Sequence, residues 1–296
     1  LLASDGSLRV KTVVRKHPGA RSLLADLALE LRAPCSRRRP RGAYGLLVRG
    51  CGALLFHSTY TSEPRARRMP NHRRRDWLRV AIEHGFHVPA VNRALWAAIF
   101  THYYRDGDCF VDDAEDFAFF MDTDASARAL AARLGLQSRL VQQVLELPFD
   151  ATPAACRDAT ALLEECEQLC RAHRVVPVVC DVLAIRGERT HALRLTTALG
   201  LGSPTGASAA CELLGAQARL AARHGARVLP GKGVYADSDT LAATTARELT
   251  TLRQLKDRWD PAGLLGGPFY RDVLAPAMLR ATGAGRVARA HAGAPE

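Results

Sequence analysis

The stretch from residue 140 to residue 229 constrains the fold more than any other part of this chain. Its apolar residues alternate between the spacing of strands and the spacing of helices, the two periods that distinguish these elements. We expect strands at 140–148, 175–184, 191–199 and 226–229, and helices at 152–173 and 207–224. The elements therefore follow one another in the order strand, helix, strand, strand, helix, strand.

This order predicts an α+β fold in which helices cover one face of an antiparallel sheet, the arrangement called ferredoxin-like. Apolar runs predict earlier strands at 8–14, 42–48 and 51–60, and helical spacing recurs over 76–104, where Pro89 interrupts it. Residues 62–75 have the proline, arginine and asparagine content of a linker. We therefore expect four parts: residues 1–61, a substrate or cap domain at 62–224, a C-terminal segment at 225–280 and a frayed tail at 281–296. No internal sequence repeat is evident.

The chain carries a net charge of +11, with 41 Lys and Arg against 30 Asp and Glu. Part of the excess lies in two arginine clusters at 37–41 and 65–75, which would attract the phosphates of nucleic acids, lipid head groups or sugar nucleotides. Aromatic residues are not interleaved with these arginines as single-strand binding requires, so solvated basic loops are the simpler interpretation. Nucleic acid is therefore not an expected partner, whereas peripheral contact of the clusters with a membrane surface stays open.

No metal site is expected. The eight cysteines include no Cys-x-x-Cys pair, so we expect free thiols in a reducing compartment, the cytoplasm. The acidic run at 106–116 lacks the ligand order of a calcium loop, and His84 and His87 have no third ligand. No segment reaches the roughly 18 consecutive apolar residues of a transmembrane helix.

The motif that points to a function lies near the C-terminal end. A short strand at 227–229 leads into Pro230-Gly231-Lys232-Gly233, and a later helical segment ends at Asp260-Pro261. This pattern resembles the C-terminal end of the FAD-linked oxidases of the vanillyl-alcohol oxidase class. It is most similar to the sugar oxidases of the decaprenylphosphoryl-ribose oxidase type. The resemblance extends over residues 117–265 and, more weakly, over residues 1–60, which it assigns to the closing part of an incomplete FAD-binding domain.

The resemblance implies roles for six residues. Lys232 matches a catalytic lysine beside the flavin ring and the substrate, where an ammonium group stabilises negative charge. Tyr44, Gly45 and Tyr235, together with Lys232, are expected to contact FAD. Gln142 and Arg186 are expected to bind the substrate.

The chain also departs from the pattern of these oxidases. Val144 stands where they have a second glutamine, Ala184 stands where they have a substrate-contacting lysine, and the glycine-rich loop that holds the FAD pyrophosphate is not visible. The chain is therefore expected to be a fragment of a longer oxidase or a relative whose flavin-binding half has degenerated.

The function implied by the resemblance is FAD-dependent oxidation of a CH–OH group of a sugar, polyol or related alcohol, by hydride transfer to flavin. Walker loops, dinucleotide fingerprints and Gly-x-Ser-x-Gly motifs are absent from the sequence. A cofactor-free ferredoxin-like binding module and a basic nucleic-acid-binding protein stay open as alternatives.

Overall fold

The computed structural model describes residues 9–33, 41–64, 89–113, 139–187, 191–201, 204–229, 234–261, 264 and 266–281. Within these ranges the strands are β1 (Arg9–His17), β2 (Arg41–Val48), β3 (Gly52–Thr61), β4 (Cys109–Asp113), β5 (Arg139–Pro148), β6 (Val179–Ile185), β7 (Ala192–Leu201) and β8 (Arg227–Leu229). The helices are α1 (Ala20–Arg32), α3 (Pro89–Ala98), α6 (Pro153–Ala172), α7 (Pro204–Arg223), α8 (Ser238–Thr244), α9 (Ala246–Trp259) and α10 (Ala275–Ala281). Two π-helical turns, η2 (Ile99–Tyr103) and η3 (Tyr270–Leu274), adjoin α3 and α10.

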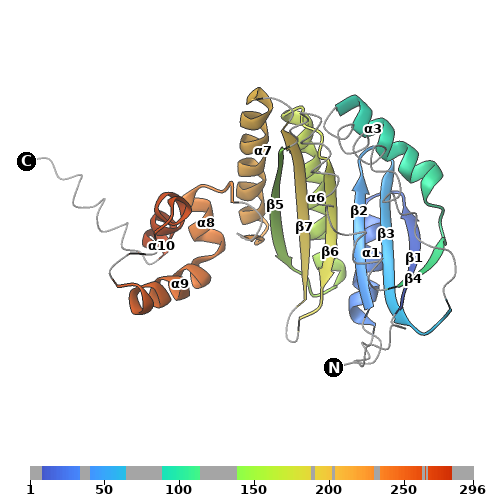
Figure 1. Ribbon diagram of the computed structural model, residues 1–296, viewed down its shortest axis with the longest axis horizontal. Coiled ribbons are helices and arrows are strands. Elements are labelled where there is room, and N and C mark those ends of the chain that lie inside the picture. The colour runs from blue at the N-terminus through green and yellow to red at the C-terminus, as the bar shows by residue number, and fades with distance from the viewer. Residues whose placement is uncertain are drawn as a thin grey trace, which may run out of the picture.

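The strands form one sheet in the order β4-β1-β3-β2-β6-β7-β5-β8 (Figure 1). Every neighbouring pair of strands in it is antiparallel. The predicted α+β class with an antiparallel sheet is therefore confirmed.

The same succession of described elements occurs twice. A first unit runs β1-α1-β2-β3-α3-β4 and a second runs β5-α6-β6-β7-α7-β8, and in each the fourth strand lies beside the first, which is followed by the third and the second. The units meet where β2 pairs with β6, through Tyr44↔Leu183, Gly45↔Val182 and Leu46↔Asp181. The sequence pattern predicted only the second unit.

Strand pairing crosses the boundary predicted at residue 61. Strands β1, β2 and β3 precede that boundary, yet β4 from beyond it pairs with β1, and β6 pairs with β2. Because backbone hydrogen bonds join the strands on both sides, the sheet continues across the predicted division.

Local sequence explains where the helices begin and how closely they pack. Helix α6 starts after Thr152, whose hydroxyl oxygen accepts a hydrogen bond from the Ala155 amide at 3.2 Å, and Pro153 stands in its first turn, where a missing N–H costs nothing. Helix α1 buries Leu23, Leu24, Leu27 and Leu31 against the sheet. Each such burial contributes about 1.5–3 kcal/mol.

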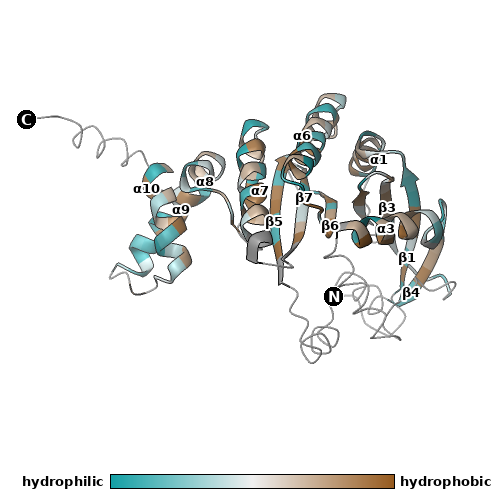
Figure 2. Ribbon diagram, turned by 90° about the horizontal axis from the view of Figure 1, so that it is seen from above, coloured by the Kyte–Doolittle hydropathy of each residue, from teal (hydrophilic) through white to brown (hydrophobic). Residues whose placement is uncertain are grey.

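The first unit has helices on both faces of its sheet (Figure 2). Because side chains alternate along a strand, Leu55 of β3 packs in the cluster below α1, while Leu54 and Phe56 pack in a second cluster with Trp96 of α3 and Phe100 of η2. The second unit has α6 and α7 on the same face as α1, so the prediction of helices on one face describes the second unit and not the first.

Helices α8, α9 and α10 pack together beyond α7 (Figure 1). Asp237 caps α8 by accepting from the Thr240 amide at 2.7 Å, and Arg280 of α10 forms an ion pair with Asp239. The C-terminal segment predicted from residue 225 thus contains a sheet strand, β8, as well as this helical group. None of the helices described here is long and apolar enough to cross a membrane.

Candidate functional site on the open face of the sheet

One face of the second unit carries no helix among the described residues. The amide of Gln143 donates to the Leu214 carbonyl of α7 at 2.8 Å, so Gln143 lies on the helix-covered face and is buried. Its neighbour Gln142 points to the opposite face and is half-buried. We call that opposite face of β5, β6, β7 and β8 the open face because no described helix covers it, although Val144, Thr196 and Ala198 on it are buried.

The open face collects polar side chains from several strands. Strand register places Gln142 and Glu146 of β5 on it, and across from them Ala198 and Arg194 of β7. Asp181 and Leu183 of β6, Thr196 of β7 and Tyr44 of β2 have the same orientation, since Asp181 pairs with Thr196 and Tyr44 pairs with Leu183. The edge of this face at β8 bears Arg227 and Leu229.

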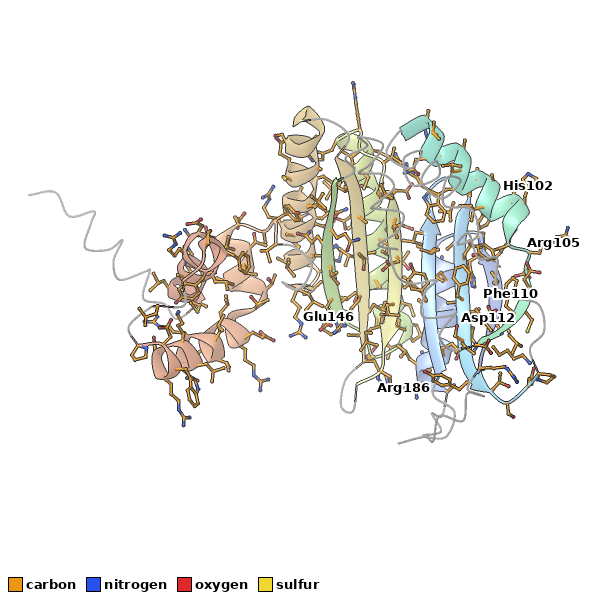
Figure 3. All side chains as sticks on the ribbon, in the orientation of Figure 1. His102, Arg105, Phe110, Asp112, Glu146 and Arg186 are labelled. Atoms are coloured by element: carbon orange, nitrogen blue, oxygen red, sulfur yellow. The ribbon has the colours of Figure 1, made fainter. Side chains whose placement is uncertain are left out.

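Glu146 is the centre of an ion-pair network at one end of the open face (Figure 3). Its carboxylate accepts from Arg194 Nε at 2.7 Å and from Arg227 Nε at 2.9 Å, and Arg227 also reaches Glu248 of α9 at 2.5 Å. Burial alone would raise the pKa of the Glu146 carboxyl, but the hydrogen bonds from Arg194 and Arg227 outweigh it and lower the pKa. Glu146 therefore stays ionised and is a poor proton acceptor near neutral pH.

Tyr44 and Asp181 form a second polar pair, at the junction of the two units. The Tyr44 hydroxyl donates to Asp181 Oδ2 at 3.4 Å, and its ring lies 6.1 Å from that of Phe56. Burial, with the negative charge of Asp181 adding to it, raises the pKa of the Tyr44 phenol. Tyr44 is thus a permanent donor, and Asp181 is the carboxylate that accepts its hydrogen bond.

Asp181 was not among the residues expected to form the site. The available signal was a single carboxylate inside the apolar run Val178–Leu183, where a charge is costly unless it has a use or a partner.

The structure brings only some of the expected site residues together. Gln142 and Tyr44 share the open face. A Cβ atom on Gly45 would lie 2.9 Å from Leu23 Cδ2, so this glycine faces α1 and permits the helix to pack closely. Tyr235 packs in the cluster with Leu213 and Leu214 of α7, on the helix-covered face.

The structure describes the contacts of Arg186 but not those of Lys232. Arg186 donates to the Ala33 carbonyl at 2.9 Å and the Glu30 carbonyl at 2.7 Å, so it satisfies the end of α1. Figure 3 shows it where the chain leaves β6. Lys232 lies outside the described residues. The strand that leads to it ends at Leu229, which pairs with Val144, two positions from Gln142.

The described residues account for only part of an FAD site. Gly45 and Tyr235 face away from the open face. Gln142, Tyr44 and the end of β8 can face only one part of such a cofactor. No three His, Cys, Asp or Glu side chains of the described residues gather as metal ligands.

Comparison with known proteins gives little further guidance. No protein-family model matches the chain, and no curated protein matches it. Among solved structures the chain is similar to 4-ethylphenol oxidase from Gulosibacter chungangensis in its isoeugenol complex, with a TM-score of 0.46 and 11% sequence identity over 87% of this chain and 52% of that chain. The chain thus spans about half the length of that oxidase.

Proposed function

We propose that the chain is the substrate-side part of an FAD-linked oxidoreductase of the vanillyl-alcohol oxidase class, acting on a CH–OH group of a sugar, polyol or related alcohol. The observation that carries the proposal is the position of Gln142 on the open face, beside the strand β8 that leads within three residues to Lys232. The sequence resemblance over residues 117–265 supports it. Each unit is then a ferredoxin-like module, which the strand order supports.

The roles proposed for the chain's own residues follow from their chemistry. Gln142 offers both a donor and an acceptor, the combination that orients a hydroxyl group. Lys232 supplies a positive charge where negative charge develops during oxidation. Asp181 is the carboxylate on the same face that could accept the hydroxyl proton, with Tyr44 holding it by a hydrogen bond. FAD supplies the redox chemistry when it is bound.

The test is anaerobic titration of the purified chain with FAD and then with a panel of sugars and polyols. Binding is followed by quenching of flavin fluorescence, and reaction by loss of the visible flavin absorbance. Lys232→Met is expected to slow that loss by about 100-fold or more, as removal of a charge-stabilising donor does. Lys16→Met is the matched control, because Lys16 lies over the Phe100 ring in the first unit. Failure of FAD to bind, or bleaching that Lys232→Met leaves unchanged, would contradict the proposal.

A cofactor-free binding module is the second candidate. Gly45, Tyr235 and Arg186 have packing or capping contacts that account for them without a cofactor. Under this alternative the protein stays colourless after exposure to FAD. Nucleic-acid binding is the third alternative, and the arginine clusters on which it depends lie outside the described residues apart from the backbone of Arg41.

We also propose that the protein is cytoplasmic, because the described cysteines are free thiols.

A further inference from the structure

A cavity of about 350 Å³ lies at one end of the junction between the two units, between α1 and α6 on one side and α3 on the other. Its walls come from the start of α1, the turn between β2 and β3, α3, α6 and the segment before β6. Asn92 donates to the Pro177 carbonyl at 3.0 Å and Trp96 to the Val178 carbonyl at 2.9 Å, and these bonds fix α3 to the segment before β6. The volume is at the small end of the range for ligand pockets, about 300–1,000 Å³.

The cavity exists because the two units separate at this end of their junction. Strands β2 and β6 pair through three residue pairs, of which the last is Leu46↔Asp181. The next residues on each strand, Leu47 and Cys180, are not paired and both line the cavity. The opening is therefore built into the way the units join.

The inner part of the cavity is lined by neutral groups. Four cysteines line the cavity, and we call three of them, Cys166, Cys170 and Cys180, the cavity thiols. Burial raises the pKa of Cys166 to about 12 and that of Cys170 to about 11, and raises the pKa of Cys180 well above its usual value. At neutral pH all three are uncharged thiols, which behave as small apolar side chains.

Gln217 provides an unused hydrogen-bond acceptor at this inner part. The side chain lines the cavity and is 1% exposed. Its Nε2 atom donates to Cys170 Sγ at 3.8 Å, but its Oε1 atom has no hydrogen-bond partner among the described residues. A buried amide oxygen without a partner costs about 1–3 kcal/mol, so a ligand that donates a hydrogen bond to it would be favoured.

The mouth of the cavity favours an anion. Arg49, Arg93 and Arg171 line it together with Glu164 and Glu167, which leaves one positive charge in excess. Glu167 is already engaged by Arg171 at 2.6 Å, whereas Arg93 is exposed and has no ion pair with any described residue. The N-terminus of α1 also opens here at Gly19 and Ala20, with no side-chain cap and no acidic residue in its first turn.

We infer that this cavity binds a small carboxylic acid with an apolar body and a hydrogen-bond donor at the end opposite the carboxylate. The carboxylate lies at the mouth, near Arg93 and the start of α1. The body lies against the cavity thiols, and the donor meets Gln217 Oε1. This site is separate from the open face and does not depend on the function proposed for that face.

The experiment is calorimetric titration of the full chain at neutral pH with three probes of equal chain length: octanoate, 1-octanol and 8-hydroxyoctanoate. Octanoate is expected to bind at one site per chain and more tightly than 1-octanol. The added hydroxyl of 8-hydroxyoctanoate is expected to tighten binding about twofold to tenfold over octanoate, the range of a net hydrogen bond. Gln217→Leu should abolish that preference while leaving octanoate binding in place.

Two further variants test the position of the site. Arg93→Ala should weaken octanoate binding about twofold to fivefold, the range for an exposed charge pair. Arg157→Ala is its matched control, an exposed arginine of α6 that does not line the cavity. Cys180→Leu should fill the cavity and reduce the binding of all three probes, provided that its circular dichroism spectrum stays that of the parent.

The inference is overturned by any of four results. These are no saturable binding of octanoate, equal affinity for 1-octanol and octanoate, a hydroxyl preference that survives Gln217→Leu, or equal effects of Arg93→Ala and Arg157→Ala. Because Arg93 is exposed, its replacement keeps the test decisive even if Cys180→Leu fails to fold.

Discussion

Replacing Glu146 with glutamine tests whether the ion-pair network on the open face stabilises the sheet. The carboxylate side chain is 8% exposed, whereas its partners Arg194 and Arg227 are 42% and 40% exposed. Breaking a buried ion pair costs about 3–5 kcal/mol when the remaining charge stays buried without a partner or contact with water. Here water can reach both arginines, and the amide retains one acceptor oxygen, so we expect Glu146→Gln to lower the free energy of unfolding by about 2 kcal/mol.

The effect of Glu146→Gln should depend on pH with a definite sign. The pKa of Glu146 is lowered in the folded protein, so its contribution is fully present above the pKa of the unfolded chain, about 4.3. It is lost as the pH falls through the lower, folded pKa. Urea unfolding, followed by circular dichroism, should therefore show a constant difference in the free energy of unfolding between parent and variant from about pH 6 to about pH 8. That difference should shrink below about pH 4.

The control for this measurement is Glu212→Gln. Glu212 is exposed on α7, and its described contact is the Ser208 hydroxyl at 2.9 Å. This change should alter the free energy of unfolding by less than about 0.5 kcal/mol. If Glu146→Gln costs no more than the control, or if its cost is the same at pH 3.5 (roughly half a unit below the onset) as at neutral pH, the network does not stabilise the sheet in the way the contacts indicate.

Three further predictions concern packing, capping and thiol reactivity. Gly52→Ala should destabilise the protein by about 3 kcal/mol or more in urea unfolding, because the new Cβ would lie 2.2 Å from a backbone oxygen, whereas Gly50→Ala, with a positive φ but open space, should cost only about 1 kcal/mol. Arg186→Ala should lower the free energy of unfolding by about 1 kcal/mol, because its two hydrogen bonds to the end of α1 are lost. An unchanged free energy of unfolding would show that these two bonds do not stabilise the protein. Alkylation of the native protein, read by peptide mass spectrometry, should modify the exposed Cys109 quickly and the cavity thiols slowly, and equal rates would contradict their burial.

The second unit was predictable because its sequence carries strong periodic signals. Observed α6 and β5 begin and end within one residue of the predicted bounds, since a Thr-Pro start and an apolar face mark α6. The strand predicted at 175–184 begins four residues later, at Val179. Val175 to Val178 are apolar, but the carbonyls of Pro177 and Val178 accept hydrogen bonds from α3, and within the described part of the chain Val178 alone of these four residues has a backbone hydrogen bond to β7.

The first unit was less predictable for physical reasons. Strand β4 contains Asp112 and Asp113, so the sequence favours an acidic loop, and only pairing with β1 makes it a strand. Helix α1 has no counterpart among the predicted elements, although Leu23, Leu27 and Leu31 recur at helical spacing. The repetition of the units is not visible as a sequence repeat. Two units can have the same fold when their elements share the same order and the same apolar periodicity, even if the residues themselves differ.

The candidate site was predictable only in part. Strand alternation predicts that only one of Gln142 and Gln143 can face a site. The position of helix α7, to which Gln143 donates a hydrogen bond, decides that it is Gln142. Gly45 and Arg186 have residue types that a cofactor or substrate site also uses, and their packing and capping contacts involve residues far away in the sequence. Pairing of Tyr44 with Asp181 depends on the junction of the two units, which no local pattern encodes.

The two outermost strands of the sheet have a consequence for how the protein behaves at high concentration. Among the described residues, no further strand pairs with the outer edges of β4 and β8, and the backbone groups of such edges can recruit strands from other molecules. Here the terminal strands are short: β8 has three residues, and β4 has five, of which two are aspartates. Short length and like charge both oppose edge-to-edge aggregation, so lengthening β8 or replacing Asp112 and Asp113 with threonine should favour it.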